Sequence, residues 1–400
     1  MPRSGWLKPE SDRRLADLVS VGVLMRVFPA EVVDGVIAEC GRTEQRRRSL
    51  PARSMAYFAM GMALHADGSY EDVLALISDG LAWADRGDEP ARLASKPAIF
   101  HARERLGSEP MALLFDRVAQ PLASKTTPGC WLAGRRLVAV DGTCLDLADT
   151  PANDEHFGRP GVMKGERSAF PQARVVALAE CGTHAMFEAI IGPYTTSENA
   201  LSRELLGRLT KGMLCLADRG FYSFEAWQKA KEGGADLLWR MKDNIRLEAV
   251  KDLPDGSWLA EVFHSTQDTR RRHPVTVRVV EYTVEDGREP TGPFRLITTI
   301  LDHRKASAVE LAGAYTQRWE IETAFDELKT HQRGPRAVLR SKSPDLVTQE
   351  IWGHLCCHYA IRALMFDAAA HAGRDPDRVS FVAALRISRR SIAQAGAFPP

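Results

Sequence analysis

Apolar residues recur at helical spacing through the first third of the chain, from Ser11 to about Leu122. One such series is Leu15, Leu18, Val19 and Val23, and another is Val73, Leu74, Ile77 and Leu81. Side chains three and four positions apart share one face of an α-helix, so this pattern predicts an all-helical N-terminal domain. The turn-forming stretch Ser124 to Gly129 follows, and we bound this domain at residues 1–128.

Beyond Arg136 the pattern changes to short apolar runs bounded by Gly, Asp or Thr, as expected of buried strands. The predicted strands are Leu137 to Val140, Val175 to Ala179, Phe187 to Ile191, Met213 to Ala217 and Leu237 to Trp239. The second and third are separated by a short polar turn, which predicts a hairpin. Helical spacing returns at about 198–208 and 224–232. Residues 129–400 are therefore predicted to form an α/β domain around a mixed sheet.

Within that domain, the alternating segments Val275 to Val279 and Phe294 to Leu296 predict a strand-built insertion at 243–300. Ser307 and Glu310 then match a capping box, which marks the start of a helix. The apolar spacing that follows continues through Lys329, so we expect one helix across this segment.

Composition and charge exclude some classes of protein but do not identify the function. The 400 residues include 53 Lys and Arg against 52 Asp and Glu, a net charge of +1, so bulk charge does not indicate a nucleic-acid partner. Five arginines nevertheless fall between Arg42 and Arg53, which predicts either a DNA-binding patch or a solvated linker. The longest uncharged apolar stretch, Met55 to Leu64, is too short to span a membrane. The seven cysteines include no CxxC pair, and Met1 to Leu18 has no apolar signal region, so we expect a cytoplasmic protein.

Two aspartates occupy similar positions next to predicted strands. Asp141 follows the run Leu137 to Val140 and precedes Gly-Thr, and Asp218 follows Met213 to Ala217 and precedes Arg-Gly-Phe. Open α/β sheets carry their sites at the ends of strands, so the pairing favours a functional role. Each aspartate taken alone is better explained as a turn or cap residue.

The predicted helix near Lys329 carries a third acidic candidate. At about 100° per residue, Tyr315, Arg318, Glu322 and Lys329 share a narrow arc beside the buried face. This stripe is also explained as a solvated helix edge with spaced ion pairs. Asp326 lies one turn from Glu322 on the same face, and helical phase does not separate the two.

Three carboxylates converging from a sheet and a helix are the hard oxygen ligands that Mg²⁺ or Mn²⁺ prefers. Two such ions would activate a water or a 3′-hydroxyl on one side of a phosphodiester and stabilise the leaving oxygen on the other. Arg318 and Lys329 would supply phosphate contacts. The pattern therefore indicates phosphoryl transfer on nucleic acid.

These residues resemble a known family. The spacing Tyr315-x2-Arg318-x3-Glu322-x6-Lys329 resembles the Tyr-Arg-Glu-Lys signature of the insertion-sequence-four family of DDE transposases. The Asp218-Arg-Gly-Phe segment resembles its second-aspartate motif, and Asp141-Gly-Thr its first. The resemblance extends to segments near Leu50, Ala102, Leu339 and Glu350, and so covers most of the chain.

The resemblance implies a ribonuclease-H-like catalytic domain with a β-strand insertion, preceded by the helical DNA-binding domain. It implies that Asp141, Asp218 and Glu322, rather than Asp326, are the catalytic metal-binding triad and hold two ions of Mg²⁺ or Mn²⁺. Tyr315, Arg318 and Lys329 would contact DNA.

The implied partners are transposon-end DNA with terminal inverted repeats and target DNA, bound by a homodimer, with no membrane. The implied activity is cleavage at the transposon ends and transfer of the 3′-hydroxyl into target DNA. The protein would be in the bacterial cytoplasm and would associate with the nucleoid when it is bound to DNA.

Two alternatives stay open at this point. The ending at Phe398 to Pro400 is abrupt beside family relatives and motivates a non-catalytic DNA-binding regulator or inactive remnant. A nuclease on the same fold would cut DNA without joining a 3′-hydroxyl to target.

Four further features of the sequence have a structural explanation beside the functional one. The Lys96 to Arg105 segment, with His101 and Arg103, is a candidate DNA-reading helix or an ordinary packed one. Arg270 to Arg272 would touch DNA backbone or form a solvated hairpin tip. Trp258 is favoured as a core residue, and the His354 and His358 pair as core histidines rather than metal ligands.

Overall fold

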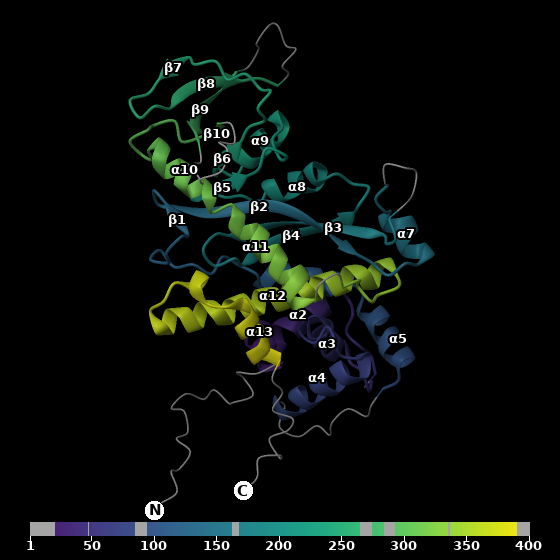
Figure 1. Ribbon diagram of the computed structural model, residues 1–400. Coiled ribbons are helices and arrows are strands. Elements are labelled where there is room, and N and C mark those ends of the chain that lie inside the picture. The colour runs from purple at the N-terminus through teal and green to yellow at the C-terminus, as the bar shows by residue number, and fades with distance from the viewer. Residues whose placement is uncertain are drawn as a thin grey trace, which may run out of the picture.

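The computed structural model describes residues 21–46, 48–84, 94–161, 168–264, 274–283, 293–334 and 337–389 (Figure 1). The helices before the sheet are α1 (Val21–Val27), α2 (Ala30–Glu39), α3 (Ala52–Leu64), α4 (Tyr70–Ala84), α5 (Lys96–Leu106) and α6 (Glu109–Val118). Those that follow are α7 (Pro151–Phe157), α8 (Glu198–Leu206), α9 (Phe224–Lys231), α10 (Ala308–Thr316), α11 (Trp319–Asp326), η2 (Glu327–Gln332), α12 (Pro344–Ala372), η3 (Pro376–Arg378) and α13 (Phe381–Arg389). The predicted helical N-terminal region is confirmed.

The strands are β1 (Trp131–Leu132), β2 (Arg135–Asp146), β3 (Gln172–Glu180), β4 (Met186–Pro193), β5 (Met213–Ala217), β6 (Asp236–Arg240), β7 (Lys251–Asp252), β8 (Trp258–Val262), β9 (Val275–Tyr282) and β10 (Phe294–Thr298). They form one sheet in the order β4-β3-β2-β5-β6-β10-β9-β8-β7, with β1 paired to β2. Strands β2, β5 and β6 are parallel, while β3 and β4 form the predicted antiparallel hairpin. The mixed sheet of a ribonuclease-H-like domain is therefore present.

One strand is longer than the sequence predicted. We expected the first strand to end at Val140, but β2 continues to Asp146 and keeps its antiparallel pairing with β3. The polar residues after Val140 interrupt the apolar run because this half of β2 is only partly buried, so the pattern conceals the strand. Asp141 consequently lies within a strand, at the point where its neighbour β5 ends, and not in a turn.

The predicted strand-rich insertion extends the same sheet. Strand β10 pairs antiparallel with β6, and β9, β8 and β7 continue outward from it (Figure 1). The boundaries 1–128, 129–400 and 243–300 stay a prediction.

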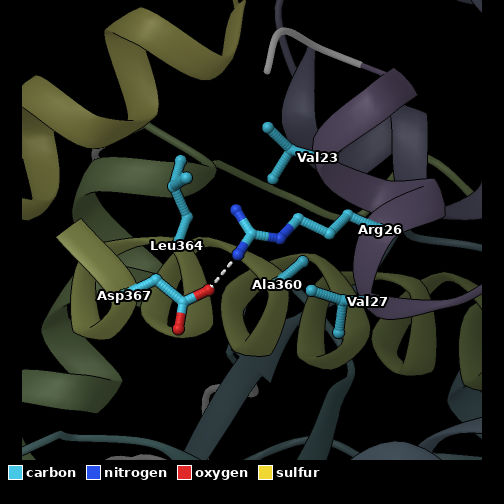
Figure 2. A pocket seen from close by; sticks show the side chains of 6 residues that line it. All are labelled: Val23, Arg26, Val27, Ala360, Leu364 and Asp367. Atoms are coloured by element: carbon cyan, nitrogen blue, oxygen red, sulfur yellow. Dashed lines mark hydrogen bonds and ion pairs between the residues drawn. The ribbon is translucent and has the colours of Figure 1, made fainter. Parts of the chain in front are cut away.

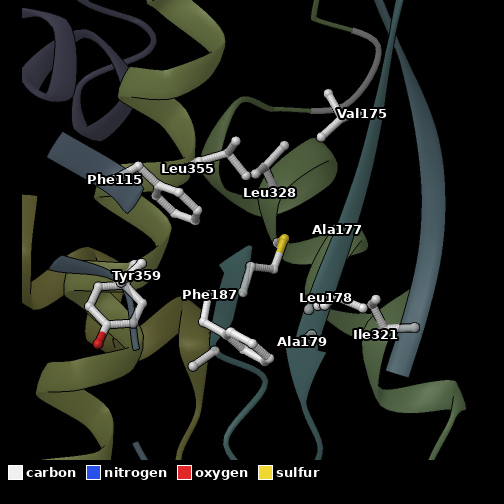
Figure 3. Close-up of a cluster of buried hydrophobic side chains, with 14 of the residues drawn as sticks. Phe115, Val175, Ala177, Leu178, Ala179, Phe187, Ile321, Leu328, Leu355 and Tyr359 are labelled. Atoms are coloured by element: carbon white, nitrogen blue, oxygen red, sulfur yellow. The ribbon is translucent and has the colours of Figure 1, made fainter. Parts of the chain in front are cut away.

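Helices cover both faces of the sheet. Helices α8 and α9 lie on one face, and α11, η2 and α12 lie on the other (Figure 1). Ile321 of α11, Leu328 of η2 and Leu355 of α12 pack with strand residues of β3 and β4 (Figure 3). This shared core fixes the helix that carries Glu322 against the sheet.

Helix α12 also packs against the N-terminal helices. Gly353 lies so close to α3 that a Cβ there would overlap the carbonyl of Ala59. Beside α1, an apolar gap lined by Val23, Val27 and Leu364 is bordered by the Arg26–Asp367 ion pair (Figure 2). One helix therefore contacts both the sheet and the helical region. Within the described ranges, no helix combines the length and apolar character that crossing a bilayer requires.

The segment after Ser307 begins as predicted but is not one helix. Ser307 and Glu310 form the reciprocal capping box at the start of α10. The helix breaks at 317–318, where Arg318 N donates to Tyr315 O in a tighter three-residue turn. Helix α11 then runs into the π-helical turn η2, which carries Lys329. The prediction of a continuous α-helix to Lys329 is wrong, since apolar spacing does not report a change of hydrogen-bonding pattern.

Candidate active site

The register of three parallel strands places two aspartates and an arginine in one row. Val140 of β2 pairs with Ala217 of β5, and Ala217 pairs with Trp239 of β6. The next residues along these strands are Asp141, Asp218 and Arg240, which therefore lie side by side across the sheet. Arg240 Nη1 lies 4.0 Å from Asp218 Oδ1, and its guanidinium stacks over the ring of Phe294.

Asp141 is the more buried of the two aspartates, with 21% of its side chain exposed against 37% for Asp218. The backbone N–H of Gly142 donates to Asp141 Oδ1 at 2.8 Å. Burial raises the pKa of Asp141 to about 6, the carboxylates of Glu198 and Glu322 add to this rise, and Gly142 and Arg318 oppose it. The site therefore disfavours the charged form of Asp141, even with Arg318 beside it, and a further cation would favour that form.

Arg318 joins the strand carboxylate to the helix carboxylate. Its Nη2 lies 2.9 Å from Glu322 Oε1, and its Nη1 lies 3.8 Å from Asp141 Oδ2. The Arg318 guanidinium also stacks against the ring of Trp319, an exposed tryptophan. Although burial would lower the pKa of Arg318, its neighbours Tyr315 and Glu322 raise it overall. One buried cation thus neutralises charge from both sides of the site.

The two acidic rivals of α11 differ in their contacts. Glu322 is paired with Arg318 beside Asp141. Asp326 instead accepts a hydrogen bond from Thr330 Oγ1 at 2.6 Å and lies 3.5 Å from His331 Nε2. The structure brings Glu322, and not Asp326, into contact with the cation that borders Asp141.

The other signature residues lie in different environments. Tyr315 is buried, and its hydroxyl donates to the carbonyl of Ala217 at 3.3 Å, directly before Asp218. Burial holds the pKa of Tyr315 well above its usual range. Lys329 is exposed on η2, within electrostatic range of Cys144 on β2. In this structure Tyr315 therefore supports the end of β5, while Lys329 is open to solvent.

Sequence reasoning missed a further carboxylate. Glu198 begins α8 and lies against Gly142, so closely that a Cβ at Gly142 would overlap Oε1 of Glu198. Burial raises the pKa of Glu198, while Arg174 lowers it and Asp218 raises it further. The glycine after Asp141 was the one signal available, because glycine marks places where another group approaches the backbone. Arg240 gave no signal beyond its place at the end of β6.

Among the described residues, no three acidic, histidine or cysteine side chains are grouped closely enough to hold a metal ion. Asp141, Asp218 and Glu322 are all oxygen donors, which suits a hard divalent cation. Glu322 is half exposed and turned toward Arg318 rather than toward Asp218. The donor types therefore fit such an ion, while Glu322 is paired with Arg318 in this structure.

Helix α5 differs from the DNA-reading helix considered from sequence. His101 is exposed, but Arg103 is 1% exposed and donates to Gln349 Oε1 at 2.9 Å and to Ser341 Oγ at 3.0 Å. Arg103 is thus a structural link to α12. Arg270 to Arg272 and Arg47 lie outside the described residues.

Other sequence candidates have structural partners. Arg53 pairs with Asp34, and Trp258 is partly buried with its indole donating to the carbonyl of Leu247. His354 and His358 are both buried, and His358 Nε2 lies 3.0 Å from Glu327 Oε2.

Two family models of transposases match this chain. The family model "Transposase DDE domain" matches residues 132–360, and the model "Insertion element 4 transposase N-terminal" matches residues 18–116. The transposase InsG for insertion sequence element IS4 of Escherichia coli (strain K12) is 31% identical over 360 residues, covering 88% of this chain and 78% of that protein. The putative transposase InsZ of the same organism is 26% identical over 254 residues, covering 63% of this chain and 82% of that protein.

A solved structure, the cryo-EM structure of the piggyBac transposase synaptic complex with hairpin DNA, aligns with a TM-score of 0.49 at 12% identity. It covers 94% of this chain and 80% of the other.

A mixed sheet that brings two aspartates together, with a glutamate-bearing helix across them, is the architecture of a DDE transposase domain, and the first model matches more than half of the chain. With both family models matched and InsG as a relative, this chain belongs to the insertion-sequence-four family of DDE transposases. The resemblance seen in the sequence is confirmed, as is a DNA transposase function.

Proposed function

We propose that Asp141, Asp218 and Glu322 are the catalytic carboxylates of this transposase and together hold divalent metal, two ions of Mg²⁺ or Mn²⁺. The observation that carries the proposal is the junction at Arg318, which joins Glu322 to Asp141 next to the strand-end Asp218. Like-charged side chains converge there, and burial penalises the charge of Asp141. A divalent cation would relieve both penalties.

When bound, the metal pair would activate the attacking hydroxyl and stabilise the leaving oxygen of a phosphodiester. The chain's own residues would orient the reaction. The sheet holds Asp141 and Asp218 on adjacent rigid strands, and Tyr315 supports the backbone immediately before Asp218. Glu322, on a half-exposed helix face, would turn from Arg318 toward the aspartates as the metal sites fill.

We also propose that Tyr315, Arg318 and Lys329 contact DNA phosphates beside the cleaved bond. Lys329 is exposed and needs no rearrangement. Arg318 would exchange its pairing with Glu322 for a bidentate contact with phosphate, for which the planar guanidinium is well suited. Tyr315 would contribute its hydroxyl only after releasing the carbonyl of Ala217.

The proposed substrates are transposon-end DNA with terminal inverted repeats and a target duplex, brought together by a homodimer in the bacterial cytoplasm, at the nucleoid. Cleavage at the ends would be followed by transfer of the 3′-hydroxyl into the target. No observation on the described residues favours a non-catalytic regulator.

The test uses the full chain and a duplex that carries the inverted repeats flanking its coding region. We expect strand cleavage and joined products with Mg²⁺ or Mn²⁺, and neither with EDTA. Cleavage without joining would indicate a nuclease, and binding without cleavage under any divalent metal would indicate a regulator. Undiminished cleavage in EDTA would contradict the metal proposal.

A further inference from the structure

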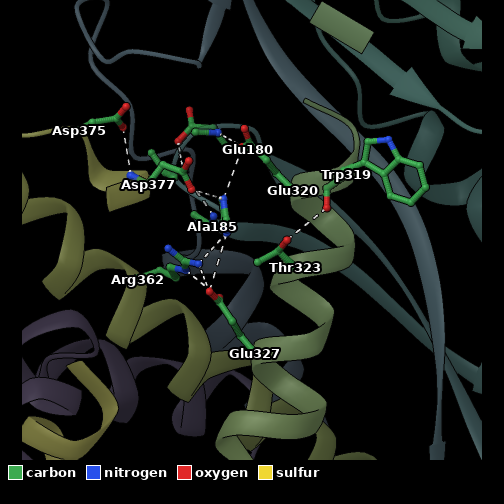
Figure 4. Close-up of polar contacts among 12 residues, drawn as sticks. Glu180, Ala185, Trp319, Glu320, Thr323, Glu327, Arg362, Asp375 and Asp377 are labelled. Carbon is green, nitrogen blue, oxygen red and sulfur yellow. Dashed lines mark hydrogen bonds and ion pairs between the residues drawn. The ribbon is translucent and has the colours of Figure 1, made fainter. Parts of the chain in front are cut away.

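A buried ionic network lies beside α11 and η2 and includes Glu320, Glu327 and Arg362 (Figure 4). Its centre is Glu327, the first residue of η2, which is 5% exposed. Arg362 of α12 donates to Glu327 through both Nε, at 2.9 Å, and Nη2. His358, one turn earlier on α12, lies 3.0 Å from the same carboxylate. Two side chains of α12 therefore hold the glutamate that directly follows α11.

The turn between β3 and β4 joins the same network. His184 in that turn has a φ of 55°, a left-handed backbone that a non-glycine residue seldom adopts. Its Nδ1 accepts from Arg362 Nη2 at 2.6 Å, and its Nε2 lies 3.1 Å from Asp377 Oδ1 in η3. The side chain of His184 is therefore held by partners from two other elements, which compensates for the backbone strain.

The same turn contacts α11 at a second point. Glu320, near the start of α11, accepts a hydrogen bond from the backbone N–H of Gly182. Glu320 and Glu327 are seven residues apart, about two helical turns, so both face the β3–β4 turn. Glu322 lies roughly 200° around the helix from Glu320, on the side of the strand aspartates. The helix is thus tied at both ends of one face while its opposite face carries the proposed catalytic carboxylate.

Stability alone does not explain this arrangement. Buried ion pairs often contribute less to stability than apolar residues of the same volume would, because both charges lose their hydration. Burial would raise the pKa of Glu327, but His184, His358 and Arg362 hold it well below its usual range, so the charge is retained. A paired charge with several directional bonds fixes orientation in a way that apolar packing does not. The π-helical turn begins at this residue, so the network holds the helix where its hydrogen-bonding pattern changes.

We propose that Glu327 is a positioning residue, whose bonds to Arg362, His358 and the His184 turn set the rotation of α11 and so place Glu322 opposite Asp141 and Asp218. The inference rests on the proposed role of Glu322. Outer residues that orient metal-binding side chains typically contribute about 10- to 100-fold to activity.

The test compares the wild-type full chain with the double variant Glu327→Gln/Arg362→Gln, which removes both buried charges together and leaves neither unpaired. Arg362→Lys is the second variant, because it retains the charge but not the two-pronged contact with Glu327. The matched control is Glu350→Gln, a buried glutamate on α12 whose partners are the backbone and hydroxyl of the 340–341 segment.

Three quantities are measured: the thermal unfolding midpoint, hydrogen exchange of the backbone amides of 319–332, and single-turnover cleavage of inverted-repeat DNA per folded molecule. We expect the double variant to exchange faster in 319–332 and to cleave about 10- to 100-fold more slowly, with unchanged affinity for the uncleaved duplex. Arg362→Lys should shift both in the same direction by less. Glu350→Gln should shift neither, whatever its unfolding midpoint.

Wild-type exchange and cleavage in both network variants would overturn the proposal, since the network would then contribute to folding alone. A wild-type protein that cleaves no DNA would refute the proposed function instead, and the exchange measurement would still decide whether Glu327 positions α11.

Discussion

Asp141 and Asp218 stand next to each other because the residues before them, Val140 and Ala217, are register partners on the parallel strands β2 and β5. No loop conformation is needed to bring the two carboxylates together. Although the two aspartates are far apart in the sequence, the pairing of β2 with β5 holds them side by side. The rigid sheet keeps both in place before any ligand binds. Glu322, the third carboxylate that we propose for the site, is carried by helix α11 instead of the sheet.

The first prediction concerns the pH dependence of stability without metal. The pKa of Asp141 rises from 3.8 to about 6 on folding, so between these values the folded state binds more protons than the unfolded one. The free energy of unfolding therefore falls as the pH rises from 3.8 to about 6, and it stays at the lower value above pH 6. Asp141→Asn removes the titration while keeping an oxygen for the Gly142 N–H.

We expect Asp141→Asn to raise the free energy of unfolding by about 1–3 kcal/mol at pH 7.5 in EDTA, and by little at pH 4. Denaturant unfolding at the two pH values measures this. Equal effects at both pH values, or a less stable variant at pH 7.5, would show that burial of Asp141 is not the cause.

A second prediction concerns the glycine that follows Asp141. A methyl group at Gly142 would overlap the carboxylate of Glu198, so Gly142→Ala should destabilise the protein by about 1–3 kcal/mol. In a Glu198→Ala background the same change should cost little, because alanine is otherwise preferred to glycine in a strand. A double-mutant cycle in denaturant measures the coupling. Additive effects would mean that Glu198 does not occupy this position in solution.

A third prediction tests whether Arg103 of α5 is a structural residue or contacts DNA. Arg103→Met leaves the buried oxygens of Gln349 and Ser341 without their donor, and should lower the free energy of unfolding by about 2–4 kcal/mol. The exposed neighbour His101→Ala should change it by less than about 0.5 kcal/mol. Unfolding curves decide this, and affinity for end DNA per folded molecule should not change in Arg103→Met. A stable Arg103→Met variant with weakened DNA binding would reverse the assignment.

The sequence predicted best where burial is apolar and local. Strand β5 has the predicted bounds because Met213 to Ala217 is an uninterrupted apolar run, and the capping box at Ser307 is a local signal that the structure retains. Asp218 could be placed for the same reason. Strand β2 was predicted too short because its second half is polar and only partly buried.

Buried charges were less accessible to prediction. Arg103, Glu327 and Arg362 look like surface residues in a helical pattern, and they are buried because partners distant in sequence neutralise them or satisfy their hydrogen bonds. Glu198 was missed for a related reason, since its position beside Gly142 depends on how α8 crosses the sheet. Periodicity reports which faces avoid water, whereas pairing between distant polar groups is a property of the fold.

The central claim is that Glu322 completes a catalytic site with Asp141 and Asp218, and the most direct measurement compares Glu322→Gln with Asp326→Asn. Both variants neutralise one carboxylate of α11, yet only Glu322 contacts the cation bordering Asp141. With Mg²⁺ and inverted-repeat DNA, we expect Glu322→Gln to fold and bind the ends but to lose cleavage by at least about 10³-fold, while Asp326→Asn cleaves at close to the wild-type rate. Undiminished cleavage by Glu322→Gln, or its loss in Asp326→Asn alone, would contradict the claim.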